Sequence, residues 1–169
     1  MILKFRMLSD ENDNFVRDLE VSHEMTLAEF NDFIVRALGY DNCMSSFFTA
    51  DDLWERQREF TLMDMDGGVG GEEKPIPMSE ITLAELAVAE CNKLIWQFDM
   101  FGDRAMYLEL VNAGQPEKGL KYPRVAFENA PVPDQYDPDA VSSDEGSIFD
   151  EMMGDFGEFD GDDNYDDEY

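Results

Sequence analysis

Few side chains in this sequence have the type and spacing of a catalytic or metal site. The single histidine, His23, stands beside Glu24 before an expected helix, which excludes a histidine-rich metal site. The run Asp64-Met65-Asp66-Gly67 begins like a calcium loop. It places Val69 where the loop needs its sixth-position glycine and Pro75 where it needs a bidentate glutamate, so the motif fails.

The other polar clusters also favour structural roles. Cys43 and Cys91 have neither metal spacing nor a disulfide framework, so we expect reduced, buried thiols. The glycines of residues 67–71 lack a phosphate-loop lysine and predict a linker. Asp99 and Asp103 lie at an expected hairpin turn, where a surface ion pair is favoured over a catalytic carboxylate pair. We therefore predict a non-enzymatic protein without a metal or cofactor.

The C-terminal stretch gives a clearer indication of function than these polar clusters do. Residues 125–169 contain 16 acidic side chains and no lysine or arginine, a composition that predicts disorder in isolation. Six apolar residues within it have the spacing of one helical face, although Gly154 and Gly157 each cost about 1 kcal/mol against a helix. We expect residues 131–169 to be an acidic tail whose apolar residues fold against a partner. These residues are Ile148, Phe149, Met152, Met153, Phe156 and Phe159.

The charge of the whole chain narrows the classes of partner. The sequence has 40 acidic and 12 basic residues, a formal net charge of −28. Residues 1–124 hold 24 acidic and 12 basic side chains, which gives −12. Such a field repels nucleic acids and anionic membranes, so we expect basic proteins as partners. No apolar run approaches the roughly 20 residues of a membrane helix and no signal peptide is evident, so we expect a cytoplasmic protein.

The first forty residues predict a hairpin followed by a helix. Alternating apolar residues predict strands over 2–8 and 15–21, joined by a polar turn. Thr26 and Glu29 have the spacing of a capping box that begins a helix, and Gly39 is a natural end for it.

The rest of the folded part predicts more strands and one short helix. A second capping box at residues 82–85 predicts a helix that ends near Glu90. The order of the expected strands and helices along the chain predicts an α+β domain over residues 1–130. In this domain a mainly antiparallel or mixed sheet packs against one longer and one short helix. The arrangement resembles a β-grasp. The remaining strands are expected over 44–49, 58–62, 93–99, 105–112 and 122–127.

Six stretches of the chain, taken in order and spacing, also resemble a known family. They are residues 2–7, 26–40, 46–48, 82–86, 94–104 and 121–124. Together they are similar to the plasmid pRiA4b ORF-3-like family of bacteria over roughly residues 1–130. The resemblance implies a fold rather than an activity, because the family is largely uncharacterised.

The resemblance includes a turn motif formed by Phe101, Gly102, Asp103 and Arg104. This chain departs from the usual family pattern there, with one inserted residue and without the tryptophan and histidine that follow in relatives. Some members carry resolvase-like labels. The absence of a basic DNA-binding region here argues against recombinase chemistry.

These observations favour an adaptor or regulator that binds a basic protein through the acidic tail. One alternative is an inhibitor that mimics nucleic acid, with carboxylates in place of phosphates. Another is a small-ligand binder or enzyme with a pocket near Trp54, Trp96 and Phe101.

Overall fold

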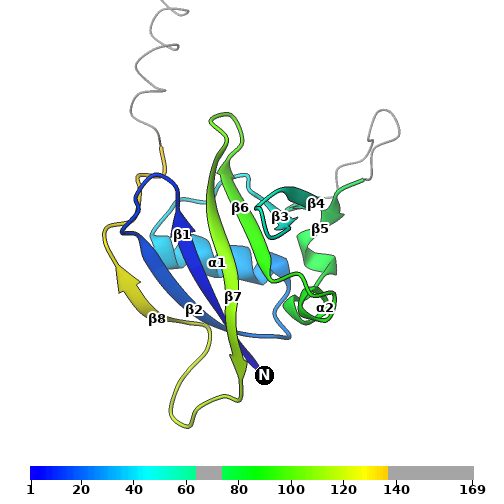
Figure 1. Ribbon diagram of the computed structural model, residues 1–169, viewed down its shortest axis with the longest axis vertical. Coiled ribbons are helices and arrows are strands. Elements are labelled where there is room, and N and C mark those ends of the chain that lie inside the picture. The colour runs from blue at the N-terminus through cyan, green and yellow to red at the C-terminus, as the bar shows by residue number, and fades with distance from the viewer. Residues whose placement is uncertain (64–73, 137–169) are drawn as a thin grey trace, which may run out of the picture. The chain divides into compact units, whose positions relative to one another are not determined.

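The computed structural model describes residues 1–63 and 74–136, and all structural statements below concern these residues. One large sheet is covered on one face by a helix, as Figure 1 shows. The helices are α1 (Leu27–Leu38), the 3-10 turn η1 (Met78–Glu80) and α2 (Leu83–Val88). The strands are β1 (Ile2–Ser9), β2 (Val16–Ser22), β3 (Ser46–Ala50), β4 (Arg56–Thr61), β5 (Ile76–Pro77), β6 (Lys93–Asp99), β7 (Arg104–Gly114) and β8 (Arg124–Asn129).

The strands form one sheet in the order β5-β4-β3-β6-β7-β1-β2-β8. Neighbouring strands are antiparallel except β4 and β5, which pair in parallel. The α+β class and the mixed, mainly antiparallel sheet expected from the sequence are therefore confirmed. No strand was predicted at β5, because a two-residue element gives no periodic signal.

Local sequence determines where α1 begins and ends. The hydroxyl of Thr26 accepts from the Glu29 amide, and the Glu29 carboxylate accepts from the Thr26 amide at 2.9 Å, so the predicted capping box is confirmed. Gly39 ends the helix with a left-handed φ of 69°. The buried side of α1 presents Phe30, whose ring lies 5.8 Å from that of Phe47 on β3. This contact fixes α1 against the middle of the sheet.

The starts of the two α-helices are bonded to each other. The first amide of α1, Leu27 N–H, donates to the Ile81 carbonyl at 3.0 Å. Reciprocally, Leu83 N–H, the first amide of α2, donates to the Met25 carbonyl at 2.9 Å. The amides of a helix's first turn have no partner within the helix, so each helix start satisfies one such donor of the other. The repeated Thr-Leu-Ala-Glu sequence thus marks a joint between α1 and α2.

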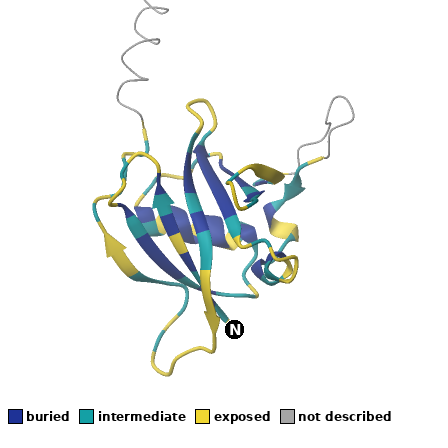
Figure 2. Cartoon of the chain, in the orientation of Figure 1, coloured by how far each residue is buried: buried dark blue, intermediate teal, exposed yellow. Residues whose placement is uncertain are grey.

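The two faces of the sheet differ in polarity. The face against α1 carries the apolar core, drawn in dark blue in Figure 2. The opposite face carries a ladder of ion pairs across β1, β2 and β8. Arg6 donates to Asp18 through two nitrogens at 2.9 and 3.0 Å. Glu20 contacts Lys4 at 3.2 Å and Arg124 at 2.7 Å. These cross-strand pairs help to fix the register of the three strands.

No helix among the described residues is long and apolar enough to span a membrane. Within residues 1–63 and 74–136, no three His, Cys, Asp or Glu side chains gather in a way that would hold a metal ion.

Candidate functional site

The turn predicted from the family resemblance connects β6 to β7. Its first residue, Asp99, accepts hydrogen bonds from the amides of Phe101 at 3.1 Å and Gly102 at 3.0 Å. The Phe101 side chain is fully exposed at the tip. Asp103 has a positive φ of 50° and accepts from Arg56 at 2.7 Å. This hydrogen bond from Arg56 lowers the pKa of the Asp103 carboxyl. Both carboxylates of the turn therefore have structural partners.

Arg104, at the end of this turn, connects three segments of the chain through hydrogen bonds and an ion pair. Its guanidinium contacts both oxygens of Glu11, in the β1–β2 loop, at 3.0 and 3.3 Å. The same group donates to the carbonyl oxygens of Asp134 and Gln135, and it lies 5.0 Å from the centre of the Phe98 ring. Only 11% of the side chain is exposed. We assign Arg104 a structural role that holds the chain after β8 onto the domain.

The segment after β8 makes further contacts with the end of α1. The Tyr40 hydroxyl donates to the Pro133 carbonyl, and burial raises the pKa of this hydroxyl. Gln135 accepts from the Asp41 amide at 2.7 Å and donates to the Asp41 carbonyl at 2.9 Å. The chain divides into two units, residues 1–135 and 136–169. The contacts of the first unit therefore continue past residue 130, where the sequence placed the boundary.

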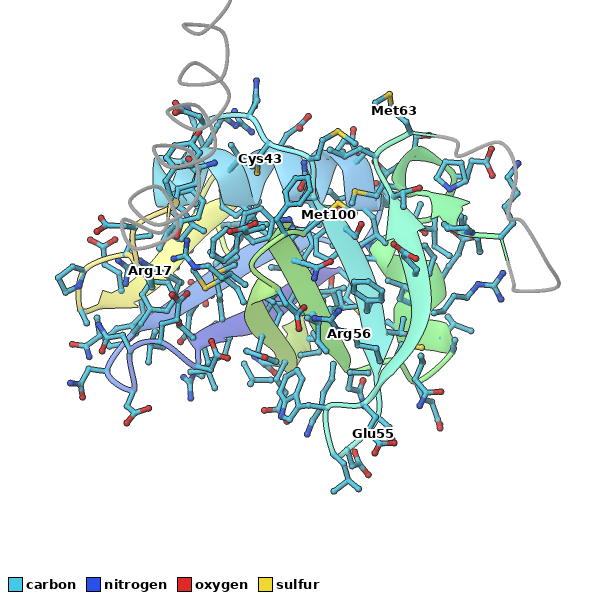
Figure 3. The ribbon with its side chains drawn as sticks, turned by 90° about the horizontal axis from the view of Figure 1, so that it is seen from above. Arg17, Cys43, Glu55, Arg56, Met63 and Met100 are labelled. Atoms are coloured by element: carbon cyan, nitrogen blue, oxygen red, sulfur yellow. The ribbon has the colours of Figure 1, made fainter. Side chains whose placement is uncertain are left out.

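The three aromatic residues of the pocket hypothesis lie in different places. Trp96 is fully buried on the α1 side and donates from Nε1 to Asn31 Oδ1 at 2.8 Å. Trp54 packs edge-on against Tyr107 at 5.3 Å, on the other side of the sheet. Figure 3 shows the neighbouring Glu55 in a loop that projects away from α1. Phe101 is at the tip of its turn, so the structure does not bring these three side chains together.

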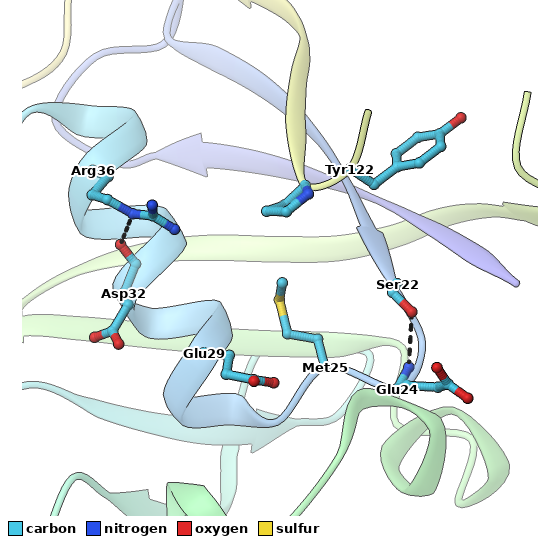
Figure 4. A pocket seen from close by; sticks show the side chains of 8 residues that line it. Ser22, Glu24, Met25, Glu29, Asp32, Arg36 and Tyr122 are labelled. Carbon is cyan, nitrogen blue, oxygen red and sulfur yellow. Dashed lines mark hydrogen bonds between the residues drawn. The ribbon is translucent and has the colours of Figure 1, made fainter. Parts of the chain in front are cut away.

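A groove that the sequence did not predict lies between α1 and the segment that enters β8. Its larger hollow has a volume of about 480 Å³. In Figure 4, Met25 lies between α1 and the chain at Tyr122. An adjoining hollow of about 320 Å³ shares Arg36 and Pro123 with the first, and Val125 of β8 also lines it. The remaining lining residues are Ser22, Glu24, Glu29 and Asp32 in the larger hollow, with Phe33 and Ala37 in the smaller.

The groove combines an apolar floor with an acidic rim. Three exposed carboxylates, Glu24, Glu29 and Asp32, line the larger hollow, against one exposed guanidinium, that of Arg36. Arg36 donates from Nε to the backbone carbonyl of Asp32 at 3.4 Å. The smaller hollow is lined mostly by carbon. Such a surface suits a cationic side chain beside an apolar one.

Sequence reasoning missed this groove because its acidic residues lie on the solvent side of α1, where charged side chains are ordinary. The signal available in the sequence was a row of groove residues at helical spacing on the solvent side of α1, because this row begins with the apolar residue Met25. The second wall comes from residues about ninety positions later. The predicted tail residues, Ile148, Phe149, Met152, Met153, Phe156 and Phe159, lie outside the described residues.

Comparison with known proteins agrees with the resemblance found in the sequence. The family model "Plasmid pRiA4b ORF-3-like protein" matches residues 2–141. The chain belongs to this family. The predicted membership is therefore confirmed, and the match covers the whole sheet and both helices.

A solved structure shows the same fold. The crystal structure of the protein of unknown function MM3350 from Methanosarcina mazei Go1 superposes with a TM-score of 0.63 at 14% identity. The match covers 93% of this chain and 82% of the other. A search of curated proteins gave no match. At this identity the similarity to the archaeal protein concerns the fold alone.

Proposed function

We propose that this plasmid pRiA4b ORF-3-like protein is a non-enzymatic cytoplasmic adaptor or regulator that binds a basic protein. The observation that carries the proposal is the one-sided charge of the chain. Residues 125–169 contain 16 acidic side chains without one basic residue. In the folded domain, three carboxylates and one guanidinium line the groove between α1 and Pro123. Both regions would attract a cationic partner and repel nucleic acid.

Two segments carry the binding in this proposal. The tail, predicted at residues 131–169, supplies apolar side chains that dock onto the partner while its carboxylates meet a basic rim. The docking part lies beyond residue 135, because residues 133–135 are hydrogen-bonded to the domain. The domain over residues 1–130 supplies the groove. We also infer a β-grasp-like arrangement, supported by the order of the β1–β2 hairpin and the following α1 across the sheet.

Capture from an extract of the host tests the proposal with three full-length proteins. The first is the unchanged chain. The second replaces Phe149, Met152, Phe156 and Phe159 by serine, which keeps the charge of the tail. The third, a control with altered charge away from the groove, carries Asp13→Asn and Asp52→Asn in exposed loops.

We expect the unchanged chain and the control to retain the same basic proteins, identified by mass spectrometry, and the tail variant to lose them. Equal partner sets for the unchanged chain and the tail variant would remove the tail from the mechanism. Displacement of the captured proteins by nucleic acid would instead favour the mimicry hypothesis.

A further inference from the structure

Strand β8 has an edge that no other described strand covers. It stands last in the sheet order and pairs with β2 on one side only. Its last three residues are exposed, including Phe127, which is 52% exposed, and Figure 2 shows the end of this strand in yellow. An uncovered edge presents unpaired N–H and C=O groups, which are a template for a further strand.

Ion pairs and hydrogen bonds hold β8 firmly at both ends. At its start, Arg124 donates to Glu20 of β2 at 2.7 Å. At its end, the buried Arg17 of β2 donates to the carbonyl oxygens of Asn129 and Ala130, each at 2.9 Å. A strand fixed in this way is already in the conformation that an added strand requires, so ordering β8 would cost little on binding.

The groove lies directly beside this edge. Val125 of β8 pairs with Leu19, whose side chain is buried on the α1 side, so Val125 points to that side as well. Val125 lines the smaller hollow together with Phe33 and Ala37 of α1. A strand added to β8 would therefore direct every second side chain into the space between α1 and the sheet.

We propose that an extended segment of the basic partner adds to the sheet beside β8. One lysine or arginine side chain enters the larger hollow, near Glu24 and Asp32, and an apolar side chain two residues away enters the smaller hollow. Side chains two residues apart in a strand lie on one face about 6.6 Å apart, and the two hollows adjoin, since Arg36 and Pro123 line both. This inference rests on the proposed function, because the cationic character of the partner comes from that proposal.

Charge argues against a second copy of this chain as the occupant. Pairing of β8 with β8 would bring together two chains of formal charge −28 each. It would also place the acidic rims of two grooves near each other, and like charges at an interface are unfavourable. The opposite edge of the sheet, β5, is a poorer template, because it has only two residues and one of them is Pro77.

Two synthetic peptides of identical composition test this geometry on the full-length protein. In Lys-Ser-Val-Ser-Lys-Ser-Val, a strand places every lysine and valine on one side. In Lys-Val-Ser-Ser-Lys-Val-Ser, adjacent lysine and valine residues point to opposite sides. Both peptides carry the same charge, so the acidic tail and the general field of the protein attract them equally.

We expect calorimetric titration to show about tenfold tighter binding of the first peptide, the contribution of one buried aliphatic side chain. The variant Glu24→Gln/Asp32→Asn should remove that preference, whereas the control Asp13→Asn/Asp52→Asn should keep it. Equal affinities of the two peptides would refute strand addition and leave the proposed function intact. Failure of both peptides to bind would refute the proposed function of the domain as well.

Methylation of single backbone nitrogens of the first peptide provides a second test. In a strand, alternate amides point to the neighbouring strand. We expect methylation to abolish binding at every second position and to have little effect between them. Uniform effects along the peptide would show that its backbone does not pair with β8.

Discussion

Replacement of Asn31 by leucine tests the buried contact that fixes α1 on the sheet, and with it one wall of the groove. Asn31 is 4% exposed, and its Oδ1 accepts from Trp96 Nε1 at 2.8 Å and from the Ser45 hydroxyl at 2.7 Å. Leucine has a similar size but accepts no hydrogen bond. The substitution would leave both donors inside the protein without this partner.

The expected loss of stability follows from these two donors. A buried donor left without a partner costs about 1–3 kcal/mol, which gives about 2–6 kcal/mol for the indole and the hydroxyl together. The serine hydroxyl can rotate toward another acceptor, whereas the Trp96 indole is held by the core. Leucine also adds buried apolar surface, so we expect Asn31→Leu to lower the free energy of unfolding by about 2–4 kcal/mol.

Urea unfolding followed by circular dichroism measures this change in a double-mutant cycle with Trp96→Phe. Phenylalanine removes the indole N–H, so Asn31→Leu should cost about 1–3 kcal/mol less in that background. Strictly additive effects, or an Asn31→Leu protein as stable as the unchanged chain, would refute the claim that this hydrogen bond holds α1.

Two further predictions concern the ion pairs of Glu20 at the start of β8 and the hydrogen bonds of Arg104 to the segment after β8. Burial opposes ionisation of Glu20, but hydrogen bonds from Arg124 and Lys4 outweigh it and lower the pKa of this carboxyl. The Glu20 carboxylate therefore stabilises the folded protein above the pKa that the residue has in the unfolded chain. This contribution to stability disappears as the pH falls through the lowered pKa. Glu20→Gln should therefore lower the free energy of unfolding by about 1–2 kcal/mol at pH 7 and by progressively less below a pH of about 4. Urea unfolding at a series of pH values measures this loss, and a loss that does not change with pH would contradict the prediction. Arg104→Lys removes the planar guanidinium that contacts Glu11 and residues 134–135. We expect faster amide hydrogen exchange, chiefly in the β1–β2 loop and in residues 132–135. Unchanged protection of these amides would contradict the structural role of Arg104.

The elements that could be predicted from the sequence are those determined by neighbouring residues. The limits of α1 follow from Thr26, Glu29 and Gly39, whose side-chain and backbone preferences act within one turn of the helix. The hairpin of β6 and β7 follows from large apolar residues at every second position on either side of a turn, Leu94, Trp96 and Phe98 before it and Met106, Leu108 and Leu110 after it. In both cases the tertiary structure selects the conformation that the local sequence already favours.

Features formed by distant residues could not be predicted in this way. Strand β5 exists because Ile76 pairs with Phe60 of β4, and its own sequence has no alternation. The two capping boxes were predicted separately, but a joint between them depends on the sheet bringing Met25 close to Leu83. The groove likewise needs Val125 and Ala37 to line one hollow, which depends on where β8 joins the sheet. Sheet order was the information missing in each case.

The ion pairs of the folded domain explain why its surface remains acidic. At least six of the twelve basic side chains contact carboxylates within the described residues, namely Lys4, Arg6, Arg17, Arg56, Arg104 and Arg124. These cations stabilise the sheet and its loops, so their charge is already compensated there. Within residues 1–63 and 74–136, no basic side chain forms an ion pair with Glu24 or Asp32 at the groove, so a partner would have to supply the opposing charge. Because both carboxylates are exposed, salt should screen that attraction, and binding at the groove should weaken as ionic strength rises.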